Sequence, residues 1–508
     1  MLTRSLRLLV WALAALAAGA FLALAARRMV YPLELDCIEG VMMDHVVRLS
    51  AGQPIYVEPS LRFIPLAYMP LFATLSALLA HAFGPHFWEP RLLSLAGALG
   101  IAALVVRVLR AETRSWTVAA AGAGFYLMGF GVTGSCYDVA RPDSLMLFLA
   151  LSGLTVLRFT SDTRGALAAA LLLTLAFFTK QHAAWFALAA AAHLALNDRR
   201  RLLPFTLAMA LGAGGGFALL TLWLGPWFPF FTLQVPAGWS QVSPARTLAY
   251  LGHGVLGRLA LMSGPALLSL TLPDRPWRGP AGLWMLAGLA ALGTGLMATL
   301  DPSAYRHVLM PTMVVAAVLG PLSIVRVMRA LGGAAAAAGA ATLLLLALQF
   351  VPLLYSIRGH LPHARAREAR GALERLLAAR PGDVLMPYHG FYAWSAKKPA
   401  SLHIIALDDI LRARGNRLLA RDPAFFDRMF EPLRHGPDRP AIVTDLPLAR
   451  SGKLWASLAG SYRLADSLGW ISEPLRPVSG NRFTPTYLYL PREDAGPPGA
   501  EAAPARAP

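Results

Sequence analysis

The strongest constraint on this chain is a succession of apolar stretches, each long enough to cross a lipid bilayer as a helix. A segment inside a bilayer must satisfy its own backbone hydrogen bonds, so stretches of this length predict helices. The first stretch also resembles a signal peptide, with Ala23-Leu24-Ala25 as a cleavage site, but its apolar run is long for one. We place eleven spans, at residues 8–26, 91–107, 116–133, 144–157, 166–179, 182–196, 203–224, 253–272, 280–299, 308–325 and 332–354.

Charge density divides the chain into two parts. Of the 508 residues, 56% are hydrophobic and only 15% are charged, which excludes an ordinary soluble globular protein. Residues 1–355 and 356–508 each carry 37 Lys, Arg, Asp and Glu side chains, so charge is more than twice as dense in the second part. We therefore predict a polytopic membrane domain over 1–354, a soluble α/β domain over 355–492 and a disordered Pro/Ala/Gly-rich tail over 493–508.

The basic residues between the apolar stretches predict the orientation. With the N-terminus in the cytoplasm, the inner loops hold 14 basic and four acidic residues, as the positive-inside rule requires. This holds only if the apolar segment 63–84 does not cross, so we expect a juxtamembrane helix there, in the first outer loop. The soluble domain then lies outside. Because many of the basic residues serve to orient the spans, the net charge of +18 does not indicate binding of nucleic acid. The inner basic residues are Arg4, Arg7, Arg107, Arg110, Arg114, Arg158, Arg164, Arg199, Arg200, Arg201, Arg275, Arg278, Arg326 and Arg329.

The soluble part alternates short helical and strand-like patterns. Helices are predicted over 365–380, 408–420 and 423–430, and strands over 384–386, 402–406, 441–444 and 487–490. Such a domain either recognises an acceptor or caps the outer loops, and the sequence leaves both interpretations open.

Carboxylates concentrate in the first two outer segments. A carboxylate held at a low-dielectric boundary can act as a general base, or can hold a metal together with a second carboxylate. A solvated loop charge is the ordinary interpretation of any single one, but here they are dense. The first segment contains Glu34, Asp36 and Glu39, and the second contains Asp138, Arg141 and Asp143.

Cations accompany these acids. Lys180 is the only lysine in the first 396 residues and lies between two apolar runs, where an ionisable group is a functional hypothesis, with a snorkelling interface lysine as the alternative. In a later outer loop Arg306 and His307 could clamp a phosphate or simply anchor the loop. Carboxylates and cations on one membrane face suit an anionic, lipid-phosphate-linked substrate, and also an ion-coupled transporter.

Two further groups of outer residues have open interpretations. Cys37 and Cys136 lie beside the acidic motifs, in a compartment that permits a disulfide, and are either paired or two unpaired thiols. An aromatic cluster is expected to anchor the chain in the headgroup layer, with packing of a prenyl chain or a sugar as the alternative. Its members are Trp227, Phe228, Phe230, Phe231 and Trp239.

The order of these features resembles the GT-C superfamily of membrane glycosyltransferases. That group includes protein O-mannosyltransferases, aminoarabinose transferases and bacterial lipopolysaccharide-core transferases. The resemblance covers roughly residues 1–330. It is carried by Asp36 and Glu39-Gly40, Gly52-Gln53-Pro54-Ile55-Tyr56, Ile64-Pro65-Leu66-Ala67-Tyr68-Met69-Pro70-Leu71, Arg141-Pro142-Asp143-Ser144-Leu145 and Thr179-Lys180-Gln181.

The resemblance implies an inverting glycosyltransferase of the bacterial inner membrane. It would move a sugar from a polyprenyl-phosphate donor to an envelope glycan, lipid or protein on the outer face. Many relatives have Asp-Glu in the first loop, and Ile38 stands at that Asp position, so the base is either Glu39, which keeps the Glu-Gly step and is preferred, or Asp36. A divalent metal stays undecided, and a transporter or flippase of a lipid-linked precursor is the alternative function. Asp143 is the implied second-loop acid, and the substrate-binding candidates are Lys180, Arg141, Asp138, Arg306, His307, Gln181 and Tyr68.

Overall fold

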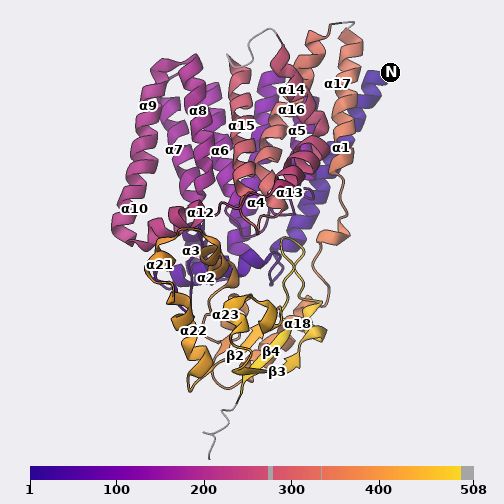
Figure 1. Cartoon of the computed structure of the whole chain (residues 1–508). Helices are drawn as coiled ribbons and strands as arrows, with labels where there is room; N and C mark the ends of the chain where they lie inside the picture. Colours follow the sequence, from indigo (N-terminus) through magenta and orange to yellow (C-terminus); the bar gives the residue numbers. More distant parts are fainter. Residues whose placement is uncertain (273–278, 333–334, 493–508) are drawn as a thin grey trace, which may run out of the picture.

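A bundle of long helices forms one half of the molecule, and a smaller domain containing a sheet forms the other (Figure 1). The structure is a computed structural model that describes residues 1–272, 279–332 and 335–492. The N-terminus lies at the end of the bundle farther from the small domain (Figure 1). The predicted tail over 493–508 and the predicted inner residues Arg275 and Arg278 lie outside the described residues.

Each of the eleven predicted spans contains a helix. Six helices in the described part of the chain are long and apolar enough to cross a membrane, and a bent pair makes seven, so the chain is a multi-span membrane protein. The number eleven stays a prediction, because several of these helices are shorter than a bilayer requires. The helices are α1 (Leu2–Met29), α4 (Trp88–Thr113), α5 (Trp116–Met128), α6 (Asp143–Phe159), α7 (Thr163–Thr179), α8 (Ala184–Asn197), α9 (Arg199–Met209) continued by α10 (Gly216–Leu224), α13 (Pro244–Leu248) followed by α14 (Ala260–Leu268), α15 (Pro280–Ala298), α16 (Met310–Ala330) and α17 (Ala335–Gln349).

The segment 63–84 does not cross the bundle. Its only helix, α3 (Leu71–Phe83), has 13 residues and lies with α2 (Cys37–Ser50) at the junction with the small domain (Figure 1). Arg91 in the first turn of α4 donates a hydrogen bond of 3.1 Å to the carbonyl oxygen of Arg28 at the end of α1. Because the chain leaves α1 and enters α4 at the same end of the bundle, the expected non-crossing segment is confirmed.

Basic residues gather at the opposite end. Arg7, Arg114 and Arg329 come from three separate helix ends and line one hollow near the N-terminus. This arrangement agrees with the charge pattern that predicted the topology. The side of the membrane that this end faces stays a prediction.

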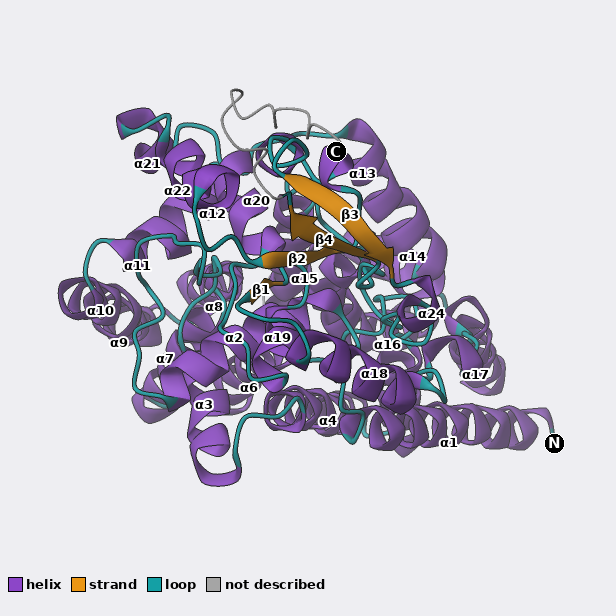
Figure 2. Ribbon diagram, turned by 90° about the horizontal axis from the view of Figure 1, so that it is seen from below, coloured by secondary structure: helices purple, strands orange, loops and turns teal. Residues whose placement is uncertain are grey.

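The small domain is built on a four-stranded mixed sheet (Figure 2). The strand order is β1-β2-β4-β3, with β1 parallel to β2 and the other pairs antiparallel. The register pairs Val384 with Ala441 and Ile442 with Tyr489. The elements are α18 (Ala366–Ala378), β1 (Val384–Leu385), α19 (Gly390–Ser395), α20 (Ile404–Arg412), α21 (Arg417–Arg421), α22 (Phe425–His435), β2 (Ala441–Thr444), α23 (Lys453–Ala456), β3 (Tyr462–Ser467), α24 (Gly469–Ser472) and β4 (Tyr487–Pro491).

Two secondary-structure predictions for this domain were wrong, and one strand was missed. The predicted strand 402–406 enters helix α20 instead, because Ile404, Leu407 and Ile410 recur with helical spacing and are buried. The predicted helix 408–420 is interrupted after Arg412, and α21 begins anew where the Asn416 side chain caps it. Strand β3 was missed because five of its six residues are exposed, so it shows no alternation of apolar and polar residues.

The three phenylalanines of the aromatic cluster between α10 and α13 pack inside the protein. Phe228, Phe230 and Phe231 are buried, and Phe228 lies 5.0 Å, ring to ring, from Tyr56 of the first outer loop. The indole N–H of Trp239 donates to the backbone carbonyl oxygen of Asp409, at 2.9 Å. These aromatic residues therefore join the bundle to the first loop and to the small domain.

The close packing of α4 on α6 is testable. A Cβ added at Gly97 would lie 2.8 Å from the backbone carbonyl of Ser144, next to the start of α6. We expect Gly97→Ala to push α6 outward and to lower the free energy of unfolding by about 1–3 kcal/mol, as overpacking does. Thermal unfolding of the purified protein in detergent measures this.

The control is Gly19→Ala on the exposed face of α1, where a Cβ would meet nothing within 4 Å. That change should be neutral or slightly stabilising, because Ala favours helix. Equal melting temperatures for the two variants would contradict the tight contact.

Candidate functional site

The first outer loop is organised by a fully buried ion pair between Glu39 and Arg91. The guanidinium of Arg91 donates to both carboxylate oxygens of Glu39, at 2.8 and 2.6 Å. Glu39 also accepts the backbone N–H groups of Leu35 and Ala140, at 2.6 and 2.8 Å. Each carboxylate oxygen of Glu39 thus accepts two hydrogen bonds. Through them this carboxylate joins the first loop, the second loop and α4.

A second buried pair, Arg28 with Asp138, fixes the second loop. Arg28 at the end of α1 donates to the two oxygens of Asp138 at 2.7 and 2.9 Å, and to the carbonyl oxygen of Ser135 at 2.9 Å. It also reaches the small domain, through the Ser479 hydroxyl at 2.9 Å. Removing either partner of such a pair would leave an uncompensated buried charge.

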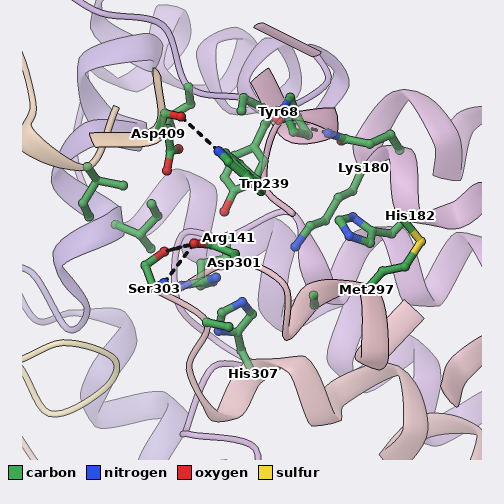
Figure 3. Close-up of a pocket in the computed structure, with 18 of the residues that line it drawn as sticks. Tyr68, Arg141, Lys180, His182, Trp239, Met297, Asp301, Ser303, His307 and Asp409 are labelled. Carbon is green, nitrogen blue, oxygen red and sulfur yellow. Dashed lines mark hydrogen bonds between the residues drawn. The ribbon is translucent and has the colours of Figure 1, made fainter. Parts of the chain in front are cut away.

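A cavity of about 490 Å³ lies where the outer loops meet the small domain (Figure 3). Its wall combines residues that are far apart in the sequence, because the two ion pairs draw their loops together. Lining residues that carry polar chemistry include Asp36, Tyr68, Arg141, Lys180, Asp301 and Asp409.

Acids and cations alternate along one side of this cavity. The Asp36 carboxylate caps the start of α2 by accepting the N–H of Ile38 at 3.1 Å, and its other oxygen lies 3.4 Å from Arg141. Arg141 lies 3.4 Å from Asp143 as well, and Asp143 accepts a 2.7 Å hydrogen bond from the ammonium of Lys180. Asp143 starts α6 and Lys180 follows α7, so two helix ends position this part of the site.

The opposite wall belongs partly to the small domain. Asp409 of α20 lies across the cavity from Lys180 and His182 (Figure 3). Arg412 pairs with Asp409 and lies 3.8 Å from Asp301. Burial raises the pKa of Asp409 to about 8, although Arg412 opposes this shift. Asp409 was not among the predicted site residues, because it is one of two adjacent acids in an amphipathic helix and no local signal marks it.

Several polar atoms at the cavity have no hydrogen-bond partner within the described residues. Gln181 donates through its amide nitrogen to the carbonyl oxygens of Ala67 and Thr232, at 3.1 and 3.2 Å, but its amide oxygen is unpaired. One ring nitrogen of His182 and one of His307 are unpaired too. Buried polar atoms usually have partners, so these atoms indicate a place for a polar ligand or for water.

The structure thus brings together most of the predicted residues. Asp36, Tyr68, Arg141, Lys180, Gln181 and His307 line the cavity, and Asp143 lies directly behind the two cations. Three predicted residues do not line it, namely Glu39, Asp138 and Arg306. Cys37 and Cys136 are both free and buried, so the disulfide considered from the sequence does not form in this structure.

The carboxylates here do not form a metal site. Arg141 lies between Asp36 and Asp143, at 3.4 Å from each, where a shared divalent ion would have to be. Among the described residues no group of three or more His, Cys, Asp and Glu side chains is placed to hold a metal ion. The residues therefore do not fit the divalent ion that was left undecided from the sequence.

Comparison with known proteins finds the same architecture at low sequence identity. No family model and no curated protein matches the sequence. ArnT from Cupriavidus metallidurans, solved bound to undecaprenyl phosphate, superposes with a TM-score of 0.57 at 13% identity, over 94% of this chain and 97% of ArnT. ArnT is a GT-C membrane glycosyltransferase. The chain shares the fold of ArnT.

The structure of an archaeal enzyme shows the same likeness of fold. The oligosaccharyltransferase of Archaeoglobus fulgidus in its apo form gives a TM-score of 0.54 at 12% identity, over 87% of this chain and 70% of that one. Its complex with Zn and sulfate gives 0.50 at 12% identity, over 86% and 68%. The resemblance predicted from the sequence is confirmed as a likeness of fold.

Behind the cavity, a buried histidine joins the first loop to the small domain. The ring nitrogens of His389 contact Glu34 at 2.6 Å and Asp445 at 2.9 Å, and Tyr392 stacks on the ring. Burial alone would lower the pKa of His389, but the carboxylates of Asp445 and Glu34 outweigh it and raise that pKa to about 10. The raised pKa favours the imidazolium form of His389 at neutral pH, between two acids whose own pKa values are raised by burial, that of Glu34 to about 7.

This cluster predicts a pH-dependent loss of stability in His389→Gln. Without the imidazolium, the variant folds only if it protonates the buried Glu34 and Asp445, which costs more as the pH rises above their ordinary pKa values. We expect it to lose about 3–5 kcal/mol near pH 7.5 and much less at pH 5. Wild-type His389 has a folded-state pKa of about 10, so the wild type keeps its imidazolium from pH 5 to pH 7.5, and only the variant must take up protons at the two acids as the pH rises.

Melting temperatures at pH 5 and pH 7.5 measure the effect. His435→Gln is the matched control, because His435 is exposed on α22 and its loss should change stability by no more than about 0.5 kcal/mol at either pH. A His389→Gln deficit that stays constant with pH would contradict a charged histidine.

Proposed function

We propose that this protein is an inverting glycosyltransferase that moves a sugar from a polyprenyl-phosphate donor to an envelope acceptor. The observation that carries the proposal is the row of Asp36, Arg141 and Lys180 on one wall of a cavity at the end of the spans. A carboxylate beside cations can activate an acceptor and stabilise a departing phosphate in one place. The GT-C fold, and a neighbour solved with undecaprenyl phosphate, support it.

The cations suit the phosphate of the donor. Arg141 and Lys180 are largely buried, and Tyr68 packs over the Lys180 ammonium, 5.4 Å from ring centre to nitrogen. A buried cation contributes more to anion binding than an exposed one, because water screens it less. Asp143 holds both cations in place and so orients them.

Asp36 is the base in this proposal, in preference to Glu39. Asp36 lines the cavity, whereas Glu39 is enclosed by Arg91 and two backbone N–H groups. The acceptor hydroxyl oxygen forms a bond to the anomeric carbon while the bond from that carbon to the phosphate oxygen breaks. The acceptor proton goes to Asp36, and the bonding electron pair leaves with the polyprenyl phosphate beside Lys180 and Arg141.

The same proposal includes the cellular setting. The site faces the outside of a bacterial inner membrane, with the N-terminus in the cytoplasm, as the basic inner loops predict. The acceptor is an envelope glycan, lipid or protein. A flippase of a lipid-linked precursor is the alternative function, and it would need the cavity to open toward both faces of the membrane.

Binding of the lipid phosphate should depend on Lys180. We expect Lys180→Met to weaken the binding of undecaprenyl phosphate to the purified protein by roughly 10- to 100-fold, because a charge-assisted hydrogen bond is lost. Titration followed by intrinsic tryptophan fluorescence measures it. Arg306→Gln is the control, since Arg306 is an exposed cation that does not line the cavity. Equal affinity of the wild type and Lys180→Met for undecaprenyl phosphate would argue against a phosphate site beside Lys180.

Transfer should depend on Asp36 rather than Glu39. Asp36→Asn keeps the helix cap of α2, because Asn caps as well as Asp, so this variant should fold and bind undecaprenyl phosphate while transfer falls about 100- to 10,000-fold. Glu39→Gln should mainly lower the melting temperature, because it breaks the pair with Arg91.

Mass spectrometry of envelope glycans and of polyprenyl-phosphate sugars in cells with each variant reports transfer. A product that persists with Asp36→Asn but disappears with a folded Glu39→Gln would reverse the assignment. If no glycan changes while a lipid-linked precursor moves between leaflets, the flippase is the better description.

A further inference from the structure

A turn of the small domain, Ser479-Gly480-Asn481, reaches the wall of the cavity beside Asp36. Gly480 and Asn481 line the cavity, although they lie more than 440 residues along the chain from Asp36. The turn is joined to the first loop by a hydrogen bond from the Ser479 N–H to the Leu35 carbonyl oxygen, at 2.8 Å. The residue that follows Leu35 is Asp36, so this bond fixes the turn directly against the candidate base.

Ser479 holds the turn through its side chain as well. Its hydroxyl donates to the carbonyl oxygen of Ser135 at 2.9 Å and accepts from Arg28 at 2.9 Å, and the side chain is buried. Since Arg28 also holds Asp138, the turn, the end of α1 and the second loop share one network. The position of Gly480 is therefore set by three segments of the chain.

The Asp36 carboxylate occupies the space that a side chain on Gly480 would need. A Cβ at this position would overlap the carboxylate carbon and both oxygens of Asp36, far inside van der Waals contact. The carboxylate is confined on its other sides by the N–H of Ile38 and the guanidinium of Arg141. No side chain larger than a hydrogen atom fits between the turn and the carboxylate.

We infer that Gly480 is a positioning residue, and that the small domain sets the orientation of the Asp36 carboxylate through it. This inference rests on the proposed function, in which Asp36 accepts the acceptor proton. It also decides between the two roles left open for the small domain, because a domain that confines the base is part of the active site and not only a cap. A misplacement of about 1 Å at a reacting group can cost roughly 100-fold in rate.

The test is Gly480→Ala in the full-length protein. The donor probe is the lipid extract of the source membranes, and release of undecaprenyl phosphate is followed by mass spectrometry. We expect the rate at saturating extract to fall roughly 10- to 100-fold, while the half-saturating amount of extract and the affinity for undecaprenyl phosphate change by less than about 3-fold.

A matched control distinguishes the effect of the clash with Asp36 from the effect of backbone strain at a positive φ. Gly480 has a φ of +60°, and Gly382, in the same domain, has a φ of +69° with nothing within 4 Å of an added Cβ. Gly382→Ala imposes the same left-handed strain without touching Asp36, so its saturating rate and half-saturating amount of extract should match the wild type. If Gly480→Ala behaves like Gly382→Ala, the inference is wrong.

A second variant keeps the test decisive if Gly480→Ala does not fold. Ser479→Ala removes the hydroxyl bonds to Ser135 and Arg28 but leaves the glycine and the bond to Leu35. We expect a smaller fall in the saturating rate, with the half-saturating amount of extract and the lipid-phosphate affinity unchanged. A wild-type saturating rate in this variant would overturn the inference. Failure of the proposed function looks different, because the wild type itself would then release no undecaprenyl phosphate, or Asp36→Asn would keep the wild-type rate.

Discussion

Four charged side chains that contact almost no water, Arg28, Glu39, Arg91 and Asp138, hold the outer loops together at the end of the bundle. A buried charge is costly unless an opposite charge and hydrogen bonds compensate it, so each pair forces its partners into one arrangement. Glu39 lies in the first turn of α2, Arg91 on α4, Asp138 on the loop after α5 and Arg28 at the end of α1. The two pairs, together with the bond from the Ala140 N–H to Glu39, therefore join four segments before any cavity residue is considered.

The cavity depends on this arrangement. Asp36 is three residues from Glu39, and Arg141 is three residues from Asp138, so the ion pairs determine how far the Asp36 carboxylate lies from the Arg141 guanidinium. Neighbouring acids in the same loops therefore have different partners. Glu39 and Asp138 each bind a buried arginine and do not line the cavity, whereas Asp36 and Asp143 lie beside Arg141 and Lys180.

Much of the bundle could be predicted from the sequence, because bilayer thickness fixes span length and basic residues mark one end of the spans. The non-crossing segment 63–84 followed from charge alone, and the bond between Arg91 and Arg28 agrees with it. The roles of Glu39 and Asp36 could not be separated in this way. Both are acids in one loop, and only the distant partner Arg91 distinguishes them. Asp409 and Gly480 reach the cavity from the small domain through long-range packing that no local pattern encodes.

In the proposed function the donor is an anion, and the charges around the cavity allow the small domain to form one wall of the cavity without repelling that anion. Burial raises the pKa of Asp409 and Arg412 pairs with its carboxyl group, so Asp409 adds little net negative charge to the opposite wall. On the near wall, Asp143 shares its two oxygens between Lys180 and Arg141, and each cation keeps N–H groups that Asp143 does not occupy. An anionic group in the cavity would meet the N–H donors of Lys180 and Arg141 on one wall and, on the other, Asp409 paired with Arg412. Polarity along the cavity is thus set jointly by helix ends of the bundle and by α20, which is why neither part of the chain forms the site alone.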